Sequence, residues 1–153
     1  MRAWRLFLGG VAVIGLALVP VGTAVADRLP GSDHGGMPES AALLAANQVP
    51  PVDTAGSGTA QITINPGHDE LCFHVTVTNL SSPVIASHIH QGAAGTNGPI
   101  VIPFPGASGN EFAGCVTVRD QLLNQVRSDP SGFYVNVHTT AHPGGEVRGQ
   151  LSR

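Results

Sequence analysis

Regular alternation of apolar and polar side chains constrains the fold of this sequence more than any other feature. Every second residue is apolar from 70 to 78, and the same period returns from 133 to 139. Successive side chains of a β-strand point to opposite faces, so this period indicates antiparallel strands with one face on a core. Six further segments bounded by turn residues also predict strands, at 43–49, 58–64, 84–90, 99–104, 111–118 and 146–151.

Composition supports an all-β domain. The 153 residues include 20 Gly and 12 Pro, and only 11% are charged, against roughly 25% in typical globular domains. Apolar residues follow helical spacing in one stretch, 120–128. We therefore predict a Greek-key antiparallel β-sandwich or barrel of about eight strands, immunoglobulin-like or superoxide-dismutase-like, with one short crossover helix. The net charge of −3 and the lack of a basic stretch argue against a nucleic-acid partner.

The N-terminal segment has the pattern of a secretory signal peptide. Two arginines precede an uncharged apolar run at 6–19, and small residues form a cleavage site that ends at Ala26. We expect cleavage after Ala26 and a protein that is secreted or held in the cell envelope, with no membrane contact after signal cleavage. The alternative is an uncleaved anchor, because the apolar segment approaches the roughly 20 residues that span a bilayer.

The predicted organisation of the chain has three parts. Residues 1–26 are the signal peptide. Residues 27–40 are rich in Pro, Gly, Ser and charge, which predicts a flexible leader. Residues 41–153 are the predicted β domain.

Two cysteines, Cys72 and Cys115, lie in the predicted exported part. An even count in an oxidising compartment predicts one disulfide between them. The alternatives are two free thiols or a soft-metal site that includes a nearby histidine.

Three of the seven histidines are placed for shared chemistry. His88 and His90 are two residues apart on one predicted strand, so both project to the same face. His138 lies on a later strand and points away from its apolar face. Imidazole is the commonest ligand for zinc and copper, so convergence would create a metal site. The alternative is that these rings hydrogen-bond to loop carbonyls and hold the turn 91–98. We find no catalytic nucleophile or acid–base pair, and predict no catalytic residue.

Six segments together resemble the CHRD (chordin) domain over residues 41–153. They are Asn47–Val52, Gly56–Ala60, Ala86–Gly92, Asn97–Val101, Gly132–Thr139 and Pro143–Leu151. Such domains occur in the BMP-binding protein chordin and as stand-alone secreted bacterial proteins. The resemblance implies an exported, non-enzymatic binding or structural module, whose extracellular or cell-surface ligand is not specified.

A fainter resemblance is to copper/zinc superoxide dismutase. The His-x-His strand, the later strand histidine and the late arginine follow a similar order, which would make His88, His90 and His138 copper ligands and Arg148 an anion guide. The pattern departs from that family because residues 91–137 contain no histidine, which removes the bridging and zinc ligands. The alternative function implied is a secreted metalloprotein with a three-histidine copper or zinc site and dismutase-like redox activity.

Overall fold

A computed structural model describes residues 36–153. The predicted signal peptide and residues 27–35 of the predicted leader lie outside this range, and within it no helix has the length and apolar character needed to cross a membrane. The described residues form one α-helix and eight strands. They are β1 (Met37–Leu44), β2 (Ser57–Asn65), β3 (Glu70–Thr78), β4 (Val84–Gln91), β5 (Ile100–Pro103), β6 (Glu111–Thr117), α1 (Asp120–Ser128), β7 (Phe133–Thr139) and β8 (Val147–Gln150).

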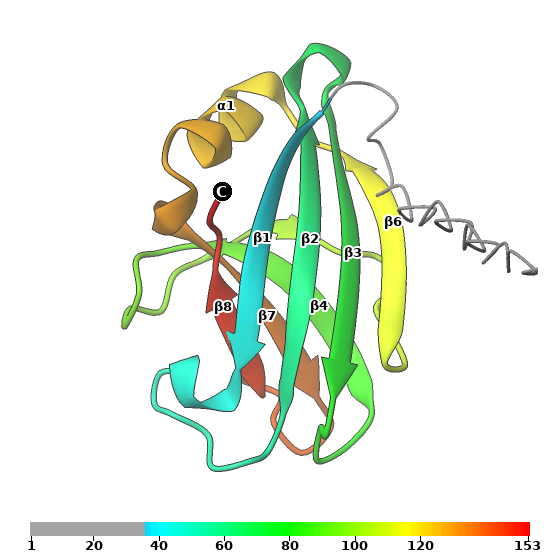
Figure 1. The fold of residues 1–153 in the computed structure, drawn as a ribbon, viewed down its shortest axis with the longest axis vertical. Coiled ribbons are helices and arrows are strands. Elements are labelled where there is room, and N and C mark those ends of the chain that lie inside the picture. Colours follow the sequence, from blue (N-terminus) through cyan, green and yellow to red (C-terminus); the bar gives the residue numbers. More distant parts are fainter. Residues whose placement is uncertain (1–35) are drawn as a thin grey trace, which may run out of the picture.

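All eight strands belong to one antiparallel sheet in the order β5-β4-β7-β8-β1-β2-β3-β6. The sheet curls, so β1, β2, β3 and β6 form one layer with β4, β7 and β8 behind it, and α1 lies over one end (Figure 1). β6 returns to β3, and β7 returns to β4 after the chain has passed through α1. These long returns are Greek-key connections, and the all-β prediction with one crossover helix is confirmed.

The two layers meet along a short corner between the first and the last strand. Leu44 of β1 pairs with Arg148 of β8, and Ser40 and Ser152 exchange two backbone hydrogen bonds of 2.7 and 2.8 Å. At the opposite side of the curl, β5 and β6 are the two outer strands of the sheet. The sheet is therefore continuous at one corner and open at the other.

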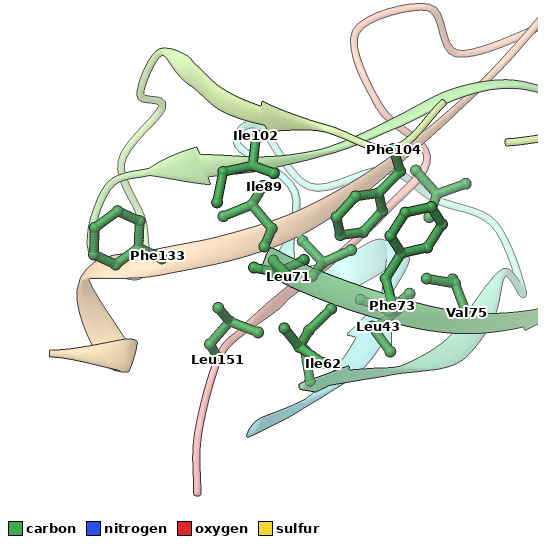
Figure 2. Packing of buried hydrophobic residues seen from close by; sticks show 14 of the residues in the cluster. Leu43, Ile62, Leu71, Phe73, Val75, Ile89, Ile102, Phe104, Phe133 and Leu151 are labelled. Carbon is green, nitrogen blue, oxygen red and sulfur yellow. The ribbon is translucent and has the colours of Figure 1, made fainter. Parts of the chain in front are cut away.

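The core lies between the two layers, and the alternation of the sequence builds it. Leu71, Phe73, Val75 and Val77 of β3 are each at most 1% exposed. Phe73 stacks on Phe104 across the interior, with ring centroids 4.1 Å apart (Figure 2). This contact joins the front layer to the segment that follows β5.

The first strand differs from its prediction. It spans Met37–Leu44 and is followed by a 3₁₀ turn at Ala45–Asn47, whereas a strand was expected at 43–49. The last four residues assigned to the flexible leader, 37–40, therefore pair with β2. Pro38 and Ser40 face outward, whereas the inward-facing Glu39 is 3% exposed and pairs with Arg153, so the polar composition of this segment does not mark a flexible leader.

The predicted disulfide is confirmed. Cys72 of β3 and Cys115 of β6 are direct partners in the antiparallel register, and their sulfur atoms are bonded at 2.10 Å. Neither cysteine is a free thiol.

Candidate metal centre

His88, His90 and His138 come together on one face of the β4–β7 pair. His90 lies opposite Tyr134, and His138 lies opposite Ala86, which puts His138 diagonal to His88. Side chains at diagonal positions of neighbouring strands are within reach of each other. One nitrogen from each ring lies within 4.8 Å of the other two, and the ring centroids are 5.0 to 6.1 Å apart.

This face of β7 is buried, which alternation alone does not predict. Every residue of β7 is buried, including those that point away from the core. Three connecting segments cover it, through hydrogen bonds from Gln48 to Asn136, from the Gly98 amide to the Tyr134 hydroxyl, and between the His138 ring and the Pro143 carbonyl. The histidines therefore lie beneath loops, in a partly desolvated cluster.

Two of the rings are fixed by backbone carbonyls. Nδ1 of His90 donates to the Gly98 carbonyl and Nδ1 of His138 donates to the Pro143 carbonyl, each at 3.0 Å. A carbonyl oxygen can only accept, so the proton of each neutral ring is on Nδ1 and the lone pair is on Nε2. Histidines that bind a metal through one ring nitrogen usually donate a hydrogen bond from the other nitrogen in this way.

The Nε2 atom of His90 is buried and has no hydrogen-bond partner among residues 36–153. A buried polar atom without a partner is uncommon, because its lost hydration is not replaced. Its lone pair is therefore available to a ligand.

His88 completes the cluster and is its most exposed member. Its Nδ1 lies 3.3 Å from Nε2 of His138. Burial, together with the electrostatic effects of His138 and His90, lowers the pKa of His88 to about 4. Burial also lowers the pKa of His90, against the opposing effect of its bond to Gly98. Both rings are accordingly neutral at neutral pH, the form that binds metal.

Arg148 occupies a different place from the one the dismutase resemblance implies. Its guanidinium lies over the far face of the Tyr134 ring, 3.4 Å from the centroid, while His90 stacks on the near face. It donates to Ala93 O and to side-chain oxygens of Asn97 and Gln150. The residue is 1% exposed. It therefore ties the 92–98 loop to β8, and this position does not suit a guide for anions from solution.

The other histidines in the described part of the chain, His68, His74 and His142, do not join this cluster. His74 on β3 contacts Glu111 of β6 at 2.8 Å on an exposed face, and His142 lies in the turn after β7. His34 lies outside the described residues. A second group, Glu70 with Cys72 and Cys115, has atoms close enough for a metal, but its sulfurs are joined in the disulfide.

The alternative interpretation, in which the rings hydrogen-bond to loop carbonyls, describes two of the three rings, because His90 bonds to Gly98 in the turn 91–98 and His138 bonds to Pro143. Tyr134 and Pro143 were not identified from the sequence as partners of the cluster. Tyr134 carries the only available signal, because alternation places it on the same face as His138. The carbonyls of Gly98 and Pro143 act through the backbone, so their side-chain identities give no direct indication of this role.

The comparison with known families is specific. A family model described as the CHRD domain matches residues 40–151, which include the whole histidine cluster and both cysteines. No curated protein and no solved structure matches the chain.

Proposed function

Because the chain belongs to the CHRD domain family, we propose that it is an exported, non-enzymatic binding module whose histidine cluster holds one zinc or copper ion. The Cys72–Cys115 disulfide supports export, since such bonds persist in oxidising compartments. The signal-peptide pattern before Ala26 supports the same location.

The observation that carries the metal proposal is the buried Nε2 atom of His90. It has no hydrogen-bond partner within residues 36–153. One nitrogen of each of the three rings lies within 4.8 Å of the other two, and Nε2 is the free nitrogen of His90 because its Nδ1 is bonded to Gly98. A metal ion would satisfy this lone pair and those of its two neighbours at once.

The distance between two of the ring nitrogens already suits a zinc ion. Zinc binds histidine nitrogen at about 2.0–2.1 Å, so two nitrogens of a tetrahedral site are about 3.3 Å apart. Nδ1 of His88 and Nε2 of His138 are 3.3 Å apart. With a metal bound, the proton of His88 would reside on its Nε2, and the lone pair of Nδ1 would bind the metal.

The donor set favours zinc or copper over magnesium or calcium. All three ligands are imidazoles, which suit transition metals, whereas magnesium and calcium prefer oxygen. No fourth protein ligand completes the group in the described part of the chain, so water would fill the remaining coordination.

The dismutase-like alternative receives less support than simple metal binding. It requires an exposed cation that attracts a small anion, and Arg148 is 1% exposed behind the Tyr134 ring. The alternative is tested by assaying superoxide removal on the copper-loaded protein.

Metal stoichiometry tests the proposal. The mature protein is stripped with chelator, incubated with zinc or copper, dialysed and analysed for bound metal. We expect one ion per chain, and a rise of about 2.7 kcal/mol in the free energy of unfolding when the free metal is about 100 times the Kd. His88→Ala removes a half-buried ligand with little effect on packing, and should abolish both effects.

His74→Ala is the matched control, because it removes a strand histidine outside the cluster. Metal uptake that survives His88→Ala and His90→Ala, or that is lost equally in His74→Ala, would contradict the proposal. Circular dichroism confirms that each variant remains folded.

A further inference from the structure

The open side of the curled sheet contains a groove that has no part in the histidine cluster. It lies between the outer strands β5 and β6, beneath α1, and has a volume of about 700 Å³. Small-molecule sites commonly occupy about 300–1,000 Å³ and occur at the mouths of β-barrels. None of the three clustered histidines lines this groove.

The floor of the groove is apolar and continuous with the core. Ile102 and Val118 are core residues, and three half-buried side chains packed against the core complete the floor. These are Val101, Val116 and Leu122. The floor is accessible because β5 and β6 do not pair with each other, so the core reaches the surface along this seam.

The charge that lines the groove is positive. Among residues 36–153, Arg119, which precedes α1, is the only charged residue that lines the groove, and no Asp or Glu does so. Across residues 36–153 its side chain has no hydrogen bond or ion pair. The remaining polar lining is uncharged, with Gln121 and Gln125 on the exposed side of α1.

From this combination we infer that the groove binds a free single-chain amphiphile with an apolar tail and a carboxylate head, such as a medium-chain fatty acid. The tail lies on Ile102, Val116 and Leu122, and the carboxylate pairs with Arg119. Burial of the tail supplies the affinity, and the unpaired cation selects the sign of the head group.

Calorimetric titration of the folded mature protein with dodecanoate below its micelle concentration tests this inference. Chelator is present, so that the histidines hold no metal. We expect saturable binding of one molecule per chain. The affinity should fall about fourfold for each methylene removed, through decanoate to octanoate, as expected for about 0.8 kcal/mol per buried methylene. Methyl resonances of Ile102, Val116, Val118 and Leu122 should shift together.

The head group is tested separately from the tail. Dodecyltrimethylammonium has a similar tail and the opposite charge, and should bind more weakly than dodecanoate. Arg119→Gln should weaken dodecanoate binding about two- to fivefold, in the range of an exposed ion pair, and should reduce the preference for the anion. Arg127→Gln is the matched control, because it removes an exposed arginine of α1 that does not line the groove.

Three results of these titrations would overturn the inference. They are the absence of saturable binding, equal affinity for the cationic and anionic amphiphiles, and equal weakening by Arg119→Gln and Arg127→Gln. Association only with vesicles that contain fatty acid, without binding of the free monomer, would likewise contradict it.

Discussion

Tyr134 lies flat against His90, with ring centroids 4.8 Å apart and an interplanar angle of 7°. Its other face carries the Arg148 guanidinium, and its hydroxyl accepts a hydrogen bond from the Gly98 amide. One aromatic ring thus connects the candidate metal ligand, the buried cation and the loop that covers both.

Replacement of Tyr134 separates these roles. Tyr134→Phe keeps the stacked ring and removes the hydroxyl, so we expect a loss of about 1 kcal/mol in the free energy of unfolding. Tyr134→Ala also leaves a cavity and removes the cation–π contact of Arg148, so we expect a loss of about 3–5 kcal/mol. Urea denaturation followed by circular dichroism measures both, and equal losses would show that the ring contributes nothing beyond its hydroxyl.

The disulfide is predicted to be a large contributor to stability. Cys72 and Cys115 are separated by 43 positions, and closing a loop of this length contributes roughly 4 kcal/mol in the chain-entropy model. The double variant Cys72→Ser/Cys115→Ser should lose a comparable free energy of unfolding, measured with guanidinium chloride. Thiol titration of the denatured, unreduced protein should find no free thiol, and two titratable thiols would contradict the bond.

The pH dependence of stability follows from His88. Its pKa is about 4 in the folded protein and near the ordinary 6.5 in the unfolded chain. Between these values the unfolded chain binds more protons, so the free energy of unfolding rises with pH across this window. The contribution is complete above about pH 6.5 and is lost as the pH falls toward 4.

Two measurements check this dependence in the metal-free protein. The ring protons of His88 should titrate by NMR with a midpoint near 4. Denaturation at several pH values should show a flatter slope in His88→Gln than in the wild type, because the other groups still titrate. A midpoint for His88 near 6.5 would contradict the predicted burial effect.

Gly98 is predicted to be intolerant of any side chain. A Cβ at this position would lie 1.6 Å from the carbonyl oxygen of Gln91, so Gly98→Ala must displace the loop. The displacement would move the carbonyl that holds His90 and the amide that holds Tyr134. We expect both a lower melting temperature and weaker metal binding. Gly67→Ala, where a Cβ meets nothing within 4 Å, is the control and should leave metal binding unchanged.

The sheet could be predicted largely from local patterns. Alternation at 70–78 and 133–139 and the helical spacing at 120–128 correspond to β3, β7 and α1 with the same bounds. These patterns are local, because the spacing of apolar residues within a segment shows which side of the strand or helix faces the core. The start of the first strand was not predicted, because residues 37–40 have the polar composition of a leader although their backbone pairs with β2.

The candidate site could be predicted only in part. The shared face of His88 and His90 follows from the pleat, whereas their approach to His138 depends on the pairing of β4 with β7, which is non-local. Burial of Arg148 depends on a loop folding over β8, and no local pattern reports it. The resemblance to another family supplied a role for this arginine that its surroundings do not support.

The corner between β1 and β8 determines how the domain responds to mechanical tension. Ser40, near the start of the first strand, and Ser152, near the end of the last, are hydrogen-bonded neighbours. A force applied to the two ends of the folded region would therefore load this corner first, and would open it one hydrogen bond after another instead of shearing several together. Tension along the chain would thus enter the fold where its first and last strands meet.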